Sequence, residues 1–169
     1  TLRCIAGLER PEQGEIYMDD ELISDMTPAT RDVAFVFQEH ILYPHMTVYE
    51  NMAFPLHPRG HSDSEINLRV VEIAEMLHIE HLLERQPSQL SGGEKQRVSI
   101  ARALVKNPLV ILADEPTGNL DPNVADEILD LLEIATESGT SVLMSTHNFP
   151  LIQPRRKRFI EIDQGRLVI

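Results

Sequence analysis

The sequence has one cysteine, no tryptophan and no long apolar run. Because Cys4 is alone, no intrachain disulfide can form, which is typical of a reducing compartment. The longest uninterrupted apolar runs, residues 33–37 and 109–113, have five residues each, far below the roughly 20 that cross a bilayer. No charged-then-apolar leader opens the chain. These absences exclude a transmembrane helix and predict a cytoplasmic location.

Basic residues are also scarce, because 15 Lys and Arg stand against 27 Asp and Glu, for a net charge of −12. A surface of this sign repels nucleic-acid phosphates, so we expect no nucleic-acid partner. The 169 residues, 42% of them apolar, suffice for one sizeable core. We therefore predict a single domain over residues 1–169.

Apolar runs alternate along the chain with segments of helical period, which is the order expected of an α/β domain with a mainly parallel sheet. Three runs, residues 33–37, 109–113 and 141–144, are apolar on both sides of the pleat. They predict buried strands with helices on both faces of the sheet.

Two helices have clear boundaries in the sequence. Residues 64–77 carry apolar residues at helical spacing with glutamates between them, which predicts a surface helix. Asp121 and Pro122 have the residue types of an N-cap and a first helical position, and Gly139 is suited to end the same helix.

Two other segments are less regular. Residues 43–63 contain three prolines and show no steady period, so we expect an irregular insertion that could face a partner. Near the end of the sequence, residues 159–163 and 166–169 flank Gln164 and Gly165, which predicts a β-hairpin.

Polar residues follow each predicted strand. Gln38 follows the first, Asp114 and Glu115 follow the second, and His147 follows the third. Ligands of open parallel sheets bind at the carboxyl ends of the strands, so these side chains should meet. Two carboxylates, an amide and an imidazole suit a magnesium nucleotide and hydrolysis of a phosphoanhydride. A single acidic strand end more often only caps the next helix.

A second pattern begins the helix that follows Leu90. Ser91 and Glu94 have the spacing of a capping box, and Gly92 and Gly93 lie between them. Two glycines in a first turn cost roughly 1 kcal/mol each in helix propensity. They also let backbone amides approach an anion at the positive end of the helix dipole, so the pattern favours a phosphate-binding helix start.

Taken in order along the chain, these motifs resemble those of the nucleotide-binding subunit of an ATP-binding cassette (ABC) transporter. The matching segments are Gln38 for the Q-loop, residues 90–96 for the signature motif, residues 110–115 for Walker B, residues 118–121 for the D-loop, and His147 for the switch histidine. The resemblance implies a P-loop NTPase-like sheet with an α-helical signature subdomain. It assigns residues 40–88 to a helical insertion and residues 89–169 to the catalytic motifs.

The resemblance also implies a role for each residue. Asp114 would hold Mg²⁺ through water, Glu115 would act as general base, His147 would sense the γ-phosphate, and Gln38 would link the metal to the membrane partner. The implied cofactors are ATP and Mg²⁺. The remaining nucleotide contacts would come from the signature motif, which acts across a dimer, and from the D-loop: Ser91, Gly92, Gly93, Glu94 and Asp121.

The same resemblance implies partners and a location. These are transmembrane permease subunits, a second ATP-binding subunit and a substrate-binding protein, with the chain peripheral on the cytoplasmic face of the plasma membrane. The insertion, which contains Met46, Met52 and Phe54, would receive the membrane subunit, and ordinary core packing of these three residues is the alternative. The implied function is ATP hydrolysis that energises transport of a solute, with carbohydrate import slightly favoured.

The sequence departs from the family pattern at its N-terminal end, since no Gly-Lys-Ser or Gly-Lys-Thr of a P-loop is present. Residues 1–9 resemble the helix that follows the P-loop. This predicts an N-terminally truncated cassette that binds ATP weakly or not at all.

The two halves of the sequence also point to different branches of the family. Residues 30–38 and 42–51 resemble sugar-importer ATPases, whereas residues 115–122 and 145–148 are more similar to cell-division and lipoprotein-releasing ATPases. Three alternatives stay open: an ATPase of that second branch, a soluble cassette of translation or DNA maintenance, and a non-catalytic cassette that pairs with an intact one.

Overall fold

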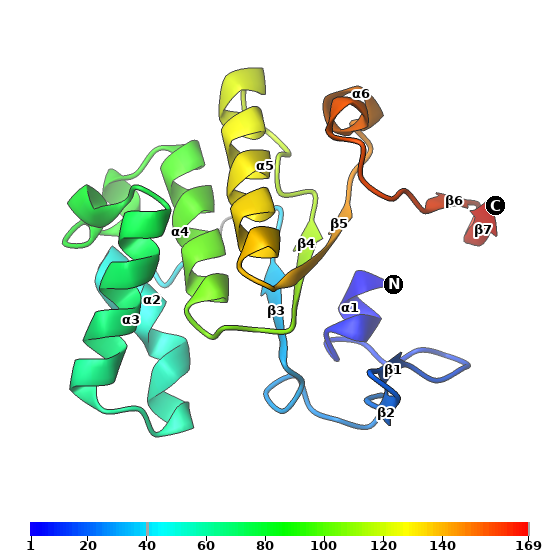
Figure 1. The fold of residues 1–169 in the computed structure, drawn as a ribbon, viewed down its shortest axis with the longest axis horizontal. Helices are drawn as coiled ribbons and strands as arrows, with labels where there is room; N and C mark the ends of the chain where they lie inside the picture. Colours follow the sequence, from blue (N-terminus) through cyan, green and yellow to red (C-terminus); the bar gives the residue numbers. More distant parts are fainter. Residues whose placement is uncertain (40, 169) are drawn as a thin grey trace.

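The computed structural model describes residues 1–39 and 41–168, and its centre is a parallel sheet of three strands. Its strands, in spatial order, are β3 (Val33–Val36), β4 (Val110–Asp114) and β5 (Ser141–Ser145). These are the three strands predicted from the sequence, each shifted by one residue at most at either end. Because the strands are parallel, their carboxyl ends share one edge of the sheet, at the upper end of β4 and β5 in Figure 1.

Helices lie around this sheet (Figure 1). The α-helices of the described residues are α1 (Leu2–Ile5), α2 (Val48–Ala53), α3 (Asp63–Met76), α4 (Gly92–Leu104), α5 (Pro122–Glu137) and α6 (Phe149–Ile152). Short 3₁₀ turns join them: η1 (Phe54–Arg59), η2 (Glu80–Leu82), η3 (Pro87–Gln89) and η4 (Gln153–Arg155). None of the helices in residues 1–39 and 41–168 is both long enough and apolar enough to span a membrane.

Side chains of the strands alternate between the two faces of the sheet. Ala34 and Ile111 belong to the main core with α4 and α5, while Val33 and Leu112 pack against α1 on the opposite face. Helices therefore flank the parallel sheet, which confirms the predicted α/β fold class. The cover on the α1 face is thin, because α1 has four residues, and Leu143 of β5 stays 37% exposed.

The two helices with clear boundaries in the sequence are confirmed. Asp121 caps α5 through its carboxylate, which accepts hydrogen bonds from the N–H groups of Asn123 and Val124 at 3.1 and 3.2 Å. Gly139 follows the end of α5 with a φ of 95°. α3 begins one residue earlier than predicted, because Ser62 caps it in a capping box with Glu65.

The expectation of an irregular segment over residues 43–63 is wrong, because α2 and η1 occupy most of it. Thr47 and Glu50 form a capping box at the start of α2, and Val48 and Met52 are fully buried against the main core. The helix is too short to show a periodic signal in the sequence. Its burial also makes Met52 a core residue rather than a surface contact.

Two β-hairpins lie apart from the central sheet (Figure 1). The predicted hairpin is confirmed as β6 (Glu161–Asp163) and β7 (Arg166–Val168), with Gln164 and Gly165 both at positive φ as a type I′ turn requires. Ile169, the end of the predicted second strand, lies outside the described residues. β1 (Tyr17–Met18) and β2 (Glu21–Leu22) form a second hairpin, which the sequence did not predict.

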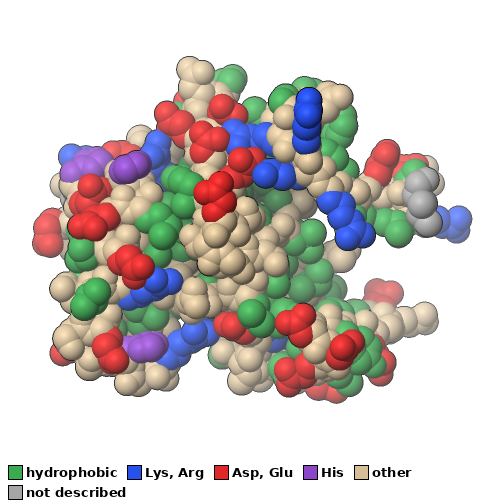
Figure 2. Space-filling view, in the orientation of Figure 1, with side chains coloured by type: hydrophobic (Ala, Val, Ile, Leu, Met, Phe, Trp, Pro, Cys, Tyr) green, Lys and Arg blue, Asp and Glu red, His purple; other side chains and the backbone are tan. Residues whose placement is uncertain are grey.

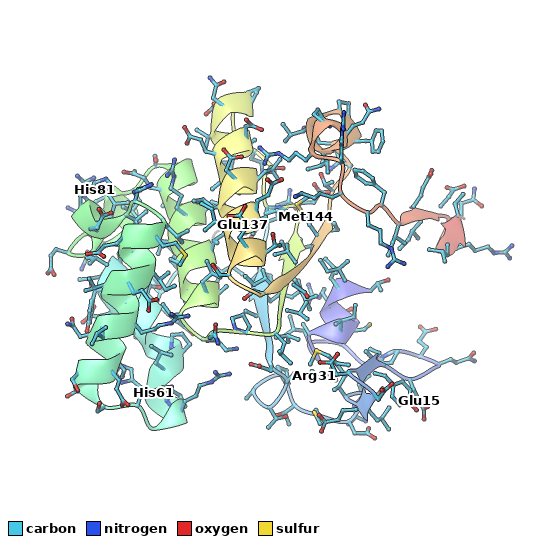
Figure 3. The ribbon with its side chains drawn as sticks, viewed as in Figure 1. Glu15, Arg31, His61, His81, Glu137 and Met144 are labelled. Carbon is cyan, nitrogen blue, oxygen red and sulfur yellow. The ribbon has the colours of Figure 1, made fainter. Side chains whose placement is uncertain are left out.

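A buried arginine joins the N-terminal helix to the rest of the fold. The Arg31 guanidinium donates hydrogen bonds to the carbonyl oxygens of Cys4 and Ile5, both at 2.7 Å, and to those of Met26 and Ser24 at 3.1 and 3.0 Å. Figure 3 places Arg31 below α1, beside the segment that carries β1. A cation at the C-terminal end of α1 also complements the dipole of that helix.

We predict that Arg31→Met lowers the free energy of unfolding by about 3 kcal/mol, because the carbonyl oxygens that Arg31 holds lose a charged donor. Urea unfolding followed by circular dichroism measures this change. Arg10→Met, at an exposed position, is the matched control and should have no effect. A loss below 0.5 kcal/mol in Arg31→Met, of the size usual for surface substitutions, would contradict this role for Arg31.

Candidate active site

The carboxyl ends of β4 and β5 bring the first pair of site residues together. Asp114 and Ser145 are register partners, and the Ser145 hydroxyl donates to Asp114 Oδ1 at 2.5 Å. The sequence prediction ended this strand at Met144, one residue too early, and so did not pair Ser145 with the aspartate. The hydrogen bond orients the Asp114 carboxylate and leaves its second oxygen available to a ligand.

The chain reverses direction at Glu115. This residue has a φ of 47°, which makes it one of eight positive-φ residues other than glycine in the described part of the chain. The left-handed region costs a side-chain-bearing residue on the order of 1–3 kcal/mol. Two backbone hydrogen bonds hold the reversal: the Glu115 N–H donates to the Ser145 carbonyl at 3.1 Å, and the Gly118 N–H donates to the Glu115 carbonyl at 2.9 Å. The carboxylate therefore has a defined direction.

Glu115 and His147 are in contact, as expected from their positions after neighbouring strands. Glu115 Oε1 lies 2.9 Å from His147 Nδ1. The glutamate side chain is 21% exposed and the histidine side chain 82% exposed. A carboxylate with one oxygen held by an imidazole and the other free can accept a proton from a water molecule, which is the arrangement of a general base.

Gln38 lies against the turn that follows Glu115. A Cβ atom added to Gly118 would come within 3.0 Å of Gln38 Nε2, so the glycine lets the amide side chain approach the turn closely. All three predicted strand ends thus contribute to one region: Gln38 from β3, Asp114 and Glu115 from β4, and His147 from β5.

The start of α4 has the predicted capping box. Ser91 Oγ accepts a hydrogen bond from the Glu94 N–H at 3.3 Å, and Glu94 Oε2 accepts one from the Ser91 N–H at 2.7 Å. Hydrogen bonding to Ser91 lowers the pKa of Glu94 below its usual value. Within the described residues, no hydrogen bond or ion pair joins Ser91 or Glu94 to Asp114, Glu115 or His147.

Gly93 has a packing role in this structure. A Cβ atom at this position would meet Val124 Cγ1 at 2.6 Å, closer than real Cβ atoms approach. The first turns of α4 and α5 therefore pack together through a glycine. Because Asp121 caps the neighbouring α5, the signature and D-loop segments lie side by side, although the Asp121 carboxylate is already engaged by two backbone N–H groups.

Sequence reasoning missed one polar residue of this region, Gln96. Its side chain is fully buried, and Nε2 donates to the Pro116 carbonyl at 2.7 Å. This bond ties α4 to the residue that follows Glu115. The available signal was a polar residue on the buried face of α4, at helical spacing from Ile100 and Ala103.

The chain is similar to known proteins over most of its length. A family model described as ABC transporter matches residues 1–118. The sulfoquinovosyl glycerol transport ATP-binding protein SmoE of Agrobacterium fabrum is 46% identical over 149 residues, 88% of this chain and 42% of SmoE. The cell division ATP-binding protein FtsE of Bacillus subtilis is 41% identical over 172 residues, 99% of this chain and 75% of FtsE.

A solved structure agrees with these relatives. The dimeric structure of the ATP-binding cassette MJ0796, in a post-hydrolysis state with ADP and Pi, matches with a TM-score of 0.76 and 36% identity, over 89% of this chain and 69% of that one. The chain spans less than half the length of the transport and import ATP-binding proteins it matches, at 42% to 48%.

We predict that Gly93→Ala and Val124→Ala are coupled. Gly93→Ala alone should lower the free energy of unfolding by about 1 kcal/mol, because overpacking against Val124 outweighs the gain in helix propensity. In the double variant the added methyl has room, so a double-mutant cycle from urea unfolding should give a coupling energy of about 1–2 kcal/mol. Strict additivity would show that the two helices do not meet at this point.

Proposed function

The chain belongs to the ABC transporter family, and on this premise we propose that it is an ATP-binding and ATP-hydrolysing subunit that energises transport of a solute across a membrane. The observation that carries the proposal is the contact of Glu115 with His147, at 2.9 Å, beside Asp114 on the carboxyl edge of the sheet. A base, a phosphate-facing imidazole and a metal-binding carboxylate are the groups that hydrolysis of a phosphoanhydride needs.

In the proposed reaction, Glu115 accepts a proton from the attacking water. The water oxygen forms a bond to the γ-phosphorus, the bond from that phosphorus to the bridging oxygen breaks, and ADP leaves with the electron pair. His147 holds one oxygen of the Glu115 carboxylate and, being largely exposed, can also turn to the terminal phosphate. The left-handed conformation of Glu115 keeps the base at this place throughout.

Asp114 and Gln38 fit a magnesium ion that arrives with the nucleotide. Both offer oxygen ligands, and the hydrogen bond from Ser145 leaves one Asp114 oxygen free. Within the described residues, no group of three or more His, Cys, Asp or Glu is arranged to hold a metal alone. This agrees with Mg²⁺, which is usually held by one or two carboxylates together with substrate phosphates and water. When bound, the ion neutralises phosphate charge.

A second ATP-binding subunit is part of the proposal. The MJ0796 structures, titled as dimeric, support pairing of two cassettes. Ser91 accepts a hydrogen bond from the Glu94 N–H but keeps its own hydroxyl proton, which it can donate to a phosphate. The first turn of α4 carries free N–H groups as well. We therefore assign Ser91, Gly92 and Gly93, with Glu94 and Asp121 holding their helix starts, to the nucleotide of the partner subunit.

The proposed membrane partner is a transmembrane permease, with the chain on the cytoplasmic face of the membrane. A cavity of about 380 Å³ opens between η1, α4 and β3 and suits such contact, since it is lined by aromatic residues and by two cations. They include Phe35, Phe37, Tyr43, Phe54, Arg102 and Lys106. Phe54 and Tyr43 pack together at 4.8 Å between ring centroids and are partly exposed, which supports the expected role of Phe54.

The transported solute is proposed as a carbohydrate, in an import system that also uses a substrate-binding protein. Relatives named as a sulfoquinovosyl glycerol transport protein and a trehalose/maltose import protein support this choice. The second candidate is a cell-division ATPase, favoured by the match that covers 75% of FtsE.

We predict that Glu115→Gln lowers kcat for Mg²⁺-dependent ATP hydrolysis by at least about 100-fold, because the amide cannot accept the proton. The KM for ATP should stay within about twofold, since the side chain keeps its size. Phosphate release by the assembled transporter is the measurement, with a family-like P-loop segment present before Thr1 in both the wild type and the variant. Glu137→Gln, at the exposed far end of α5, is the matched control and should leave kcat unchanged.

A mixed dimer with an intact cassette tests the non-catalytic alternative. Ser91→Arg should abolish hydrolysis at the site that this chain completes for its partner. If Ser91→Arg abolishes activity while Glu115→Gln has no effect, the chain only supports its partner and the proposed catalytic role is wrong. Equal losses from the two substitutions would exclude the non-catalytic alternative.

A further inference from the structure

Arg155 lies at the centre of an ion cluster outside the candidate active site. Its guanidinium contacts three carboxylates of α5: Asp126 at 2.5 Å, Asp130 at 2.8 Å and Glu133 at 3.2 Å. Figure 2 shows acidic side chains over α5 next to basic side chains between α5 and α6. The three acids follow each other at helical spacing and so form one stripe along α5.

This cluster is more constrained than an ordinary surface ion pair. The Arg155 side chain is 13% exposed, and Nη2 also donates to the Asp126 backbone carbonyl at 3.1 Å. Burial alone would lower the pKa of Arg155. The hydrogen bonds to Asp126, Asp130 and Glu133 outweigh this effect, so the pKa lies above its usual value. Glu133 gains a second cation, since Lys157 Nζ lies 3.3 Å from its carboxylate. Several partners on one arginine restrict its position far better than one partner would.

The contact between Arg155 and α5 completes a closed path of chain and contacts that includes Glu115 and His147. From Glu115 the chain passes through Asp121 into the first turns of α5, where Asp126 contacts Arg155. From Arg155 the chain runs back through η4 and α6 to His147, which contacts Glu115. Both arms of this path are short, because Asp126 lies eleven residues after Glu115 and Arg155 lies eight residues after His147.

His147 needs such support. Its side chain is largely exposed, and within the described part of the chain Glu115 is its one hydrogen-bonding partner. The segment that follows it is short and contains Pro150 and Pro154. It attaches to the body through Ile152, which is buried in the main core, through Leu151, which packs against that core, and through Arg155. Apolar contacts have little directional preference, whereas a forked arginine on three acids also limits orientation.

We propose that Arg155 is a positioning residue that locks the segment after β5 onto α5 and thereby holds His147 against Glu115. The lock itself depends on contacts of this chain alone. Its effect on hydrolysis rests on the proposed function, in which Glu115 and His147 act on ATP.

The test uses imidazole ¹⁵N spectra of the protein labelled at histidine, at fixed pH and without nucleotide. The His147 signal is identified by its loss in His147→Gln, and Glu115→Ala, which removes the acceptor, provides the chemical shift of a His147 without its partner. Arg155→Met should move the His147 shift at least halfway to that reference. Arg158→Met, at an exposed position three residues after Arg155, is the matched control and should leave the shift in place.

A second variant neutralises two of the three carboxylates that contact Arg155 and leaves Arg155 unchanged. Asp130→Asn combined with Glu133→Gln, both on the outer face of α5, should move the His147 shift in the same direction. If Arg155→Met fails to fold, this variant tests whether the Arg155 cluster positions His147. A wild-type His147 shift in every folded variant of the cluster would overturn the proposal.

The kcat for ATP hydrolysis by the assembled transporter distinguishes a failure of the positioning role of Arg155 from a failure of the proposed function. Arg155→Met should lower kcat and leave the KM for ATP unchanged, and Arg155→Lys should restore part of kcat because it keeps a cation. If the His147 shift moves in Arg155→Met while kcat stays at the wild-type value, Arg155 positions His147 but the proposed role of His147 in hydrolysis is wrong. If the shift does not move, Arg155 does not position His147, whatever the value of kcat.

Discussion

The reversal of the chain at Glu115 is the constraint on which the candidate site depends. The left-handed backbone there is unfavourable alone, and three separate elements hold the turn. β5 accepts the Glu115 N–H through Ser145, α4 donates to the next carbonyl through Gln96, and Gln38 after β3 packs against Gly118. The position of the Glu115 carboxylate, which we propose as the general base, therefore depends on the packing of the sheet on α4.

The same turn also explains how the two functional segments are joined. Gln96 belongs to the helix that begins at Ser91, so the helix start assigned to the partner's nucleotide is rigidly tied to the turn assigned to this chain's own nucleotide. Gly93 and Val124 add a second tie, between the first turns of α4 and α5. The helix start at Ser91 and the turn at Glu115 are therefore linked by two contacts within one chain.

Sequence reasoning predicted what depends on local signals. Residue types at short spacing predicted the caps of α5, the capping box at Ser91 and the three strands. The parallel sheet then placed the carboxyl ends of the strands at one edge. Sequence reasoning failed where contacts between distant residues determine the structure. α2 forms because Val48 and Met52 are buried by other elements, and Gln96 and Arg155 acquire partners twenty or more residues away. The packing role of Gly93 depends in the same way on a second helix.

A crystal structure of the Glu115→Gln variant with Mg²⁺ and ATP, in a chain that carries a family-like P-loop segment before Thr1, tests the central claim most directly, because this variant should bind the nucleotide without consuming it. We expect the metal beside Asp114 and Gln38, and the γ-phosphate within hydrogen-bonding distance of His147. A nucleotide bound elsewhere, with residues 114, 115 and 147 free of it, would contradict the assignment of this edge of the sheet as the site of ATP hydrolysis.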